Sequence, residues 1–253
     1  MPALGKVYLI GAGPGAQDLI TLRGARLLAQ ADVVLHDALV TAEMLELCPQ
    51  AEKILVGKRY GQLSTAQQFI NKQMVDNAKK FPLVVRLKGG DPMLFGRADE
   101  ELRALEEAGV EVEVVPGITT ALAAAAASKQ PLTKRGVARS VAFFTSSTAP
   151  EHSAHDAMPD TDTLVQYMGG REAIATAERL LAQGRHPDTP VVVIENCSRP
   201  DQHIRRMTVA ALAQGLGAAH GPVLVMLGDA MQARPHQASD ETPLPSAVQQ
   251  LRA

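Results

Sequence analysis

The chain has 253 residues, a length typical of one large domain or two modest ones. Its 25 Lys and Arg against 27 Asp and Glu give a formal charge of −2, which argues against a general polyanion binder, so we expect no nucleic-acid partner. Aromatic residues make up only 3% of the chain, with no Trp, which also argues against a base-stacking surface.

The first half of the chain alternates short apolar runs with helical patterns. We expect strands at residues 6–10, 33–36, 54–56, 83–87 and 111–115. We expect helices at residues 22–31, 64–80 and 99–108, the second beginning with a capping box of Ser64 and Gln67. Because strands alternate with helices, we expect an α/β fold with a mostly parallel sheet in this half.

The dipeptide Pro116-Gly117 interrupts the chain near its middle and is our expected hinge. Beyond it we expect helices at residues 120–128 and 173–183, and strands at residues 141–145, 163–167, 191–195, 204–208 and 223–227. The closer spacing of the later strands predicts a mixed sheet. We therefore expect an N-terminal α/β domain (1–115), a C-terminal α/β domain (116–232) and a polar tail (233–253).

A glycine-rich loop, Gly11-Ala12-Gly13-Pro14-Gly15, directly follows the first expected strand. Glycines permit positive φ and a close approach of backbone to ligand. A dinucleotide fingerprint needs G-x-G-x-x-G opening into a helix, whereas the spacing here is G-x-G-x-G, so a nicotinamide site is disfavoured. A tight turn without any ligand stays open as an alternative.

Three further loops end expected strands with small residues: 88–92 (KGGDP), 116–120 (PGITT) and 167–170 (YMGG). Ligands of open α/β sheets collect at the carboxyl ends of strands. Asp91 could accept hydrogen bonds from a ribose or an ammonium group, or it could only satisfy the N–H groups of its own turn. Four such loops are hard to attribute to turns alone.

These loops and their flanks resemble the tetrapyrrole methylase superfamily, and within it the enzymes that act on uroporphyrinogen III. The resemblance covers about residues 5–229. Its markers, in chain order, are VYLIGAGPGAQDLITLRG, HD (36–37), VGKR (56–59), VVRLKGGDPMLFGR, VVPGIT, PLT, YMG and ENCSRP (195–200).

The resemblance implies the two-domain tetrapyrrole methylase fold, with S-adenosylmethionine in an inter-domain cleft. It implies methylation of two pyrrole carbons of uroporphyrinogen III, giving precorrin-2 and S-adenosylhomocysteine, by a homodimer. The cofactor contacts that it implies are Pro14, Gly89, Gly90, Asp91, Leu94, Thr119, Thr120, Met168 and Cys197.

Two catalytic residues also follow from the resemblance. Asp37 matches the proposed proton acceptor and Lys58 the proposed proton donor. From the residues alone, Asp37 could instead cap a helix near residues 41–47, and Lys58 could be a solvated charge.

The implied substrate carries many carboxylates, which need cations, and Arg can bind them in a bidentate way. The resemblance implies that Arg97, Glu100 and Arg135 contact this tetrapyrrole polycarboxylate. Residues 129–139 hold four cations and no acid, which could also be a solvated face. This chain has Ser146-Ser147-Thr148 where many relatives have Thr-Gly-His, and Gly136 where they often have Asp, so the detailed placement of the substrate stays open.

We expect no metal, because His152 and His155 stand in an apparent loop without a third ligand. Cys48 and Cys197 belong to no ligand-spaced cluster. The chain shows no signal-peptide pattern and no apolar run of the roughly 18–20 residues that a membrane span needs. We therefore expect a soluble cytoplasmic protein with no membrane partner.

Two other functions stay open. One is a related precorrin methyltransferase of the same fold, and the other is a non-catalytic S-adenosylmethionine-binding protein. A fused sirohaem synthase with dehydrogenase and chelatase parts would be much longer, so we expect room here for the methylase alone.

Overall fold

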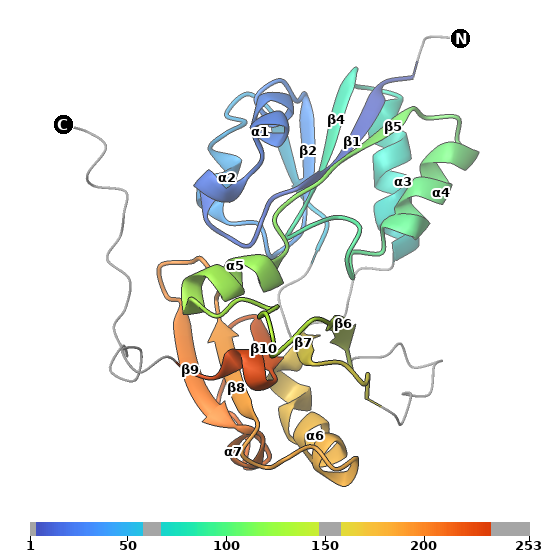
Figure 1. Ribbon diagram of the computed structural model, residues 1–253. Helices are drawn as coiled ribbons and strands as arrows, with labels where there is room; N and C mark the ends of the chain where they lie inside the picture. The colour runs from blue at the N-terminus through green and yellow to red at the C-terminus, as the bar shows by residue number, and fades with distance from the viewer. Residues whose placement is uncertain (1–3, 58–66, 147–157, 234–253) are drawn as a thin grey trace, which may run out of the picture. The chain divides into compact units, whose positions relative to one another are not determined.

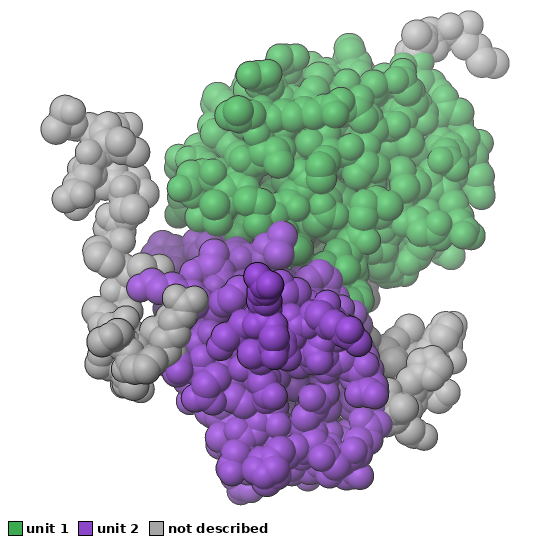
Figure 2. All heavy atoms as spheres, viewed as in Figure 1, with its two compact units in different colours: residues 1–120 green, residues 121–253 purple. Residues whose placement is uncertain are grey.

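The computed structural model describes residues 4–57, 67–146 and 158–233 (Figure 1). The chain forms two compact units, Met1–Thr120 (unit 1) and Ala121–Ala253 (unit 2), coloured green and purple in Figure 2. The division lies a few residues after the boundary that the sequence led us to expect. Each unit is built around its own five-stranded sheet.

The sheet of unit 1 is entirely parallel, with the strand order β3-β2-β4-β1-β5. Its strands are β1 (Lys6–Gly11), β2 (Val33–His36), β3 (Glu52–Leu55), β4 (Leu83–Lys88) and β5 (Val112–Val115). The chain leaves β2 toward β3 and leaves β4 toward β5, so the connections of these two neighbouring strands diverge. Such a switch point opens a crevice at the carboxyl ends of the strands.

Helices cover both faces of this sheet, because its strands are apolar on both sides. They are α1 (Leu22–Leu28), α2 (Ala42–Leu45), α3 (Gln67–Ala78) and α4 (Ala98–Glu107), with a short 3₁₀ helix, η1 (Gln17–Leu19). Helices α3 and α4 pack on one face, where Ile70, Met74 and Leu105 are buried. Helices α1 and α2 pack on the other, with Leu28 and Met44 in the core.

The sheet of unit 2 is mixed, with the order β6-β7-β10-β8-β9. Its strands are β6 (Val141–Thr145), β7 (Thr163–Tyr167), β8 (Pro190–Glu195), β9 (His203–Thr208) and β10 (Val223–Leu227), and of these pairings only β6–β7 is parallel. The expected parallel N-terminal sheet and mixed C-terminal sheet are therefore confirmed.

The helices of the second half are α5 (Thr120–Ser128), α6 (Gly169–Ala182), α7 (Val209–Leu212) and η2 (Asp229–Met231). One face of the sheet buries side chains of α6 and α7, and the other buries side chains of α5 and η2. Helix α6 starts earlier than the expected residue 173, because Gly169 and Gly170 belong to its first turn. Among the described residues, no helix is long and apolar enough to cross a membrane.

Candidate functional site

Three loops of unit 1 meet at the carboxyl ends of β1, β4 and β5, and glycines make their close approach possible. Gly13 and Gly90 donate N–H groups to each other's carbonyl oxygens, at 3.1 and 2.7 Å. A Cβ at Gly117 would lie 2.3 Å from the Gly90 carbonyl oxygen and 2.7 Å from the Gly11 Cα. This contact of loops, the glycine junction, explains why three of the expected strands are followed by loops that contain glycine.

Asp91 ties two of these loops together. Its Oδ2 accepts a hydrogen bond from the Gly117 N–H at 2.9 Å, and its Oδ1 accepts one from the Met93 N–H at 2.8 Å. Asp91 therefore does accept a hydrogen bond from an N–H group of its own turn, as one alternative held, and it accepts a second one from the loop after β5. An ionised carboxylate has about four acceptor sites, so Asp91 keeps capacity for a donor on a ligand.

Asp37 follows β2 and is held by two backbone N–H groups. Its Oδ1 accepts from Leu39 at 3.0 Å and its Oδ2 from Gly89 at 3.2 Å. The alternative in which Asp37 caps a helix does not hold for α2, whose cap is the Thr41 hydroxyl, bonded to the Met44 N–H. A carboxylate of this kind, fixed and half-buried at the end of a strand, can take up a proton.

Lys58, the other expected catalytic residue, lies outside the described residues. The described chain reaches Gly57, where a Cβ would lie 3.0 Å from the Asp37 Cα. The segment that leads to Lys58 therefore passes directly beside Asp37.

Leu94 and Arg97 lie in the loop between β4 and α4, and Glu100 lies in the first turn of α4. Arg97 forms a two-point ion pair with Glu100, with both N···O distances at 2.7 Å, and this guanidinium holds the pKa of Glu100 below its usual range. Phe95 and Arg97 both have positive φ, 51° and 55°, which is uncommon for non-glycine residues. Such backbone strain is often found at functional sites.

The other cofactor candidates of unit 1 are half-buried near the same strand ends. Pro14 lies in the loop after β1, Thr119 lies between β5 and α5, and Thr120 is the first residue of α5. The structure thus gathers the candidates of unit 1 at one edge of its sheet.

In unit 2, Met168 and Cys197 follow β7 and β8. Met168 has a φ of 57°, precedes the first turn of α6 and is 49% exposed. Cys197 is buried, and burial raises the pKa of its thiol to about 11. The Cys197 thiol is therefore neutral at neutral pH, so this residue offers an apolar contact rather than a nucleophile.

Arg135 is exposed in a tight turn between Lys134 and Ala138, which exchange two backbone hydrogen bonds of 2.8 Å. Gly136 has a φ of 77° there, so the departure from the relatives' Asp coincides with a left-handed turn position. The second departure, Ser146, has a buried partner, because its hydroxyl accepts a hydrogen bond of 3.0 Å from the Gln166 amide of β7.

A sequence model described as Tetrapyrrole (Corrin/Porphyrin) Methylases matches residues 6–213 of the chain. The chain belongs to the tetrapyrrole methylase family. This confirms the resemblance and, with the two sheets, the expected fold class.

Two solved structures from Thermus thermophilus are similar to this tetrapyrrole methylase. The native form of uroporphyrin III C-methyl transferase is 37% identical with a TM-score of 0.80, and the match covers 95% of this chain and 98% of that one. The same enzyme complexed with S-adenyl homocysteine is 40% identical with a TM-score of 0.78, over 89% and 98% of the two chains. A cobalt precorrin-4 methyltransferase is 30% identical, with a TM-score of 0.76, over 90% and 96%.

Among curated proteins, siroheme synthase 1 of Klebsiella pneumoniae is 44% identical over 232 residues. That match covers 90% of the methylase chain and 49% of the synthase. The chain therefore spans about half the length of the curated relatives it matches.

One feature of the methylase site was not predicted from the sequence. Arg86 and Lys88, on β4, both contact the buried Glu101 of α4, at 3.1 and 2.8 Å. The expected buried strand at residues 83–87 includes Arg86, whereas Lys88 was expected at the start of the following loop, and the pattern does not identify the anion that these two cations contact. The signal was available, because two cations at i and i+2 in a strand point to the same face.

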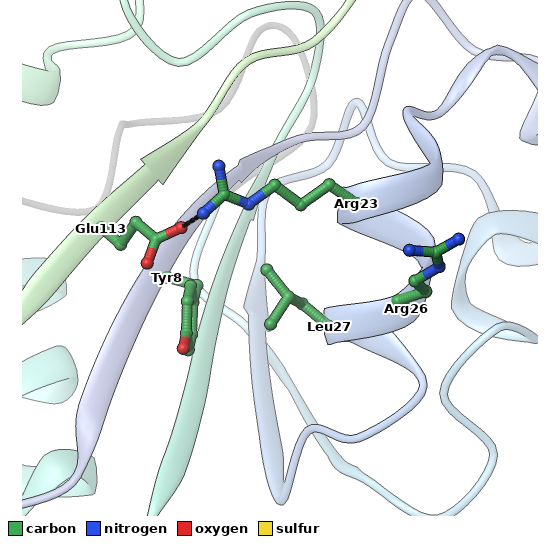
Figure 3. A pocket seen from close by; sticks show the side chains of 5 residues that line it. All are labelled: Tyr8, Arg23, Arg26, Leu27 and Glu113. Carbon is green, nitrogen blue, oxygen red and sulfur yellow. Dashed lines mark hydrogen bonds and ion pairs between the residues drawn. The ribbon is translucent and has the colours of Figure 1, made fainter.

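Two pockets formed by described residues are not lined by any of the candidate residues. Figure 3 shows a pocket of about 200 Å³ in unit 1, where Arg23 of α1 reaches Glu113 of β5 above Tyr8. A second, of about 410 Å³, lies in unit 2 around Glu195 and His203. His152 and His155 lie outside the described residues, and within them no group of three or more His, Cys, Asp or Glu could hold a metal ion.

Proposed function

We propose that this tetrapyrrole methylase methylates two pyrrole carbons of uroporphyrinogen III, giving precorrin-2 and S-adenosylhomocysteine. One observation carries the proposal: the 40% identity, across nearly the whole of both chains, to the Thermus thermophilus enzyme complexed with S-adenyl homocysteine. The glycine junction supports it, because glycines without a Cβ let a ligand approach the backbone closely at the carboxyl ends of parallel strands.

The proposed cofactor residues suit a molecule with a polar end and an apolar middle. Leu94 and the exposed Met168 would contact the methionine chain, and Asp91 would accept a hydrogen bond from a ribose or the ammonium group. The full proposed set is Pro14, Gly89, Gly90, Asp91, Leu94, Thr119, Thr120, Met168 and Cys197. Bound S-adenosylmethionine supplies an electrophilic sulfonium methyl, so the proposed reaction does not require a metal.

The chain's own task is to hold the electron-rich pyrrole carbon in line with the methyl group and to move protons. Positioning of this kind contributes several kcal/mol to a rate. Asp37 would accept the proton that leaves the macrocycle, since its carboxylate is fixed by two N–H groups. Lys58 would act as the proton donor. Arg97, Glu100 and Arg135 would contact the carboxylates and other polar groups at the edge of the substrate.

We further propose that the methylase works as a homodimer, as its resemblance to the family implies. Size-exclusion chromatography with light scattering tests the dimer, and a monomeric mass at micromolar concentration would exclude it.

A binding titration and an activity assay test the proposed function against its alternatives. S-adenosylmethionine should bind in a calorimeter while NAD should not, and addition of uroporphyrinogen III under anaerobic conditions should release S-adenosylhomocysteine. Binding without release would favour the non-catalytic protein. Release only with a later corrin intermediate would favour the alternative that the 30% identity to a cobalt precorrin-4 methyltransferase supports.

A further inference from the structure

A buried ionic cluster lies at the carboxyl end of β4, on the face that α3 and α4 cover. It consists of Arg86, Lys88 and Glu101, whose side chains are 5%, 4% and 0% exposed. Arg86 Nε lies 3.1 Å from Glu101 Oε1, and Lys88 Nζ lies 2.8 Å from Glu101 Oε2. The Gln67 amide of α3 also donates to Glu101 Oε1, at 3.3 Å.

The charges of this cluster do not balance. Arg86 and Glu101 already form a pair, and Arg86 also donates to the Leu87 carbonyl oxygen at 3.1 Å. Lys88 adds a second cation to one carboxylate, and a buried charge without its own counter-ion is unfavourable. Burial, and then the charge of Arg86, hold the pKa of Lys88 below its usual range. The fold therefore gains little from this ammonium group.

Lys88 lies directly beneath the proposed cofactor and substrate loop. The next residue, Gly89, donates its N–H to Asp37, and a Cβ at Gly96 would lie 3.2 Å from the Lys88 Cε. Four charged side chains of the described residues act on Lys88 or feel its charge: Arg86, Asp37, Glu100 and Glu101. Of these, Asp37 is the proposed proton acceptor.

We propose that Lys88 is a positioning residue of the methyl-transfer site. Its charge acts on the Asp37 carboxylate, and its methylene chain supports the loop between Gly89 and Arg97. Because this role serves the reaction and not the fold, it rests on the proposed function.

The first test separates the reaction from stability with Lys88→Met. Arg86 and Glu101 remain paired in this variant, so its thermal unfolding midpoint should be no lower than that of the wild type. Its kcat for methyl transfer should fall about tenfold to a hundredfold, the loss typical of a misplaced reacting group. Wild-type kcat should also decline at alkaline pH as Lys88 loses its proton, and in Lys88→Arg the midpoint of the decline should move to higher pH, where only other groups such as Lys58 still lose protons. Full activity of Lys88→Met, or an unchanged midpoint of the decline in Lys88→Arg, would overturn the proposal.

The second test does not depend on turnover. In protein labelled with ¹³C at lysine Cε, the Lys88 signal is the one that Lys88→Arg removes. Since the charge of Asp37 raises the pKa of Lys88, Asp37→Asn should lower the pH midpoint of that signal, while the control Glu107→Gln, exposed in the last turn of α4, should leave it unchanged. An unchanged midpoint in Asp37→Asn would overturn the proposal. A lowered midpoint in a protein that methylates no tetrapyrrole would instead count against the proposed function alone.

Discussion

Two acidic side chains of the candidate site, Asp37 and Asp91, are fixed by backbone N–H groups. Asp37 is held by the N–H groups of Leu39 and Gly89, and Asp91 by those of Met93 and Gly117. The sequence placed both acids at strand ends from the local pattern. It could not say which N–H groups would close on them, because two of the four donors come from a different strand end.

At this scale the account predicts the effect of removing the proposed substrate cations. Arg97→Ala or Arg135→Ala should raise the KM for the tetrapyrrole several-fold while leaving the affinity for S-adenosylhomocysteine nearly unchanged. The Arg97–Glu100 pair is about half-exposed, and such pairs stabilise a protein by only about 0–1 kcal/mol, so Arg97 can turn to a substrate carboxylate. Steady-state kinetics measures the change in KM, and Arg103→Ala, in α4, is the control. Unchanged KM in both variants would remove them from the substrate site.

Elements were predicted most accurately where the pattern was strongly apolar. Strands β2, β6, β7 and β10 have the expected bounds, whereas the four-residue helix α7 was not predicted and α2 entered only through the alternative in which Asp37 caps a helix near residues 41–47. Those helices are too short for a 3.6-residue period to emerge, and each depends on one Thr cap. The ionic cluster was missed for a different reason. The depth of Arg86 and Lys88 follows from α3 and α4 packing over them, which no local pattern records.

The glycine junction gives a prediction at the scale of elements. Gly117→Ala should lower the affinity for S-adenosylhomocysteine at least about tenfold, because its methyl group would meet the Gly90 carbonyl oxygen and separate two loops. Gly109→Ala is the matched control: it has a φ of 68° and nothing within 4 Å, so it should cost about 1–2 kcal/mol of folding free energy only. Calorimetric titration of both variants with S-adenosylhomocysteine measures the two affinities. Equal affinities would mean that the junction does not form the cofactor site.

The start of β6 gives a prediction about pH. Asp162 Oδ2 accepts hydrogen bonds from the Ser140 hydroxyl and from the N–H groups of Ser140 and Arg139, at 2.7, 3.0 and 2.9 Å, and these bonds lower the pKa of Asp162. The stability it contributes is therefore present above the unfolded value of about 3.9 and is lost as the pH falls through the lower folded value. Urea unfolding should show Asp162→Asn less stable than the wild type at pH 7, with the difference shrinking below pH 4. A difference for Asp162→Asn that stays constant at every pH would contradict the assignment.

At the scale of the molecule, each unit has its own sheet and its own buried cores. The proposed cofactor residues come from both, with Met168 and Cys197 in unit 2 and the others in unit 1. The net charge of −2 conceals a local feature, because the exposed residues Lys129, Lys134, Arg135 and Arg139 form a run without acids. Such a run suits a compact polycarboxylate rather than a nucleic acid.

The measurement that tests the central claim most directly is the mass of the product. The wild-type protein, incubated anaerobically with ¹³C-methyl S-adenosylmethionine and uroporphyrinogen III, should give a macrocycle carrying two labelled methyl groups and two equivalents of S-adenosylhomocysteine. Asp37→Asn should give far less of both. A macrocycle that gains no methyl group, under conditions in which S-adenosylmethionine binds, would contradict the account.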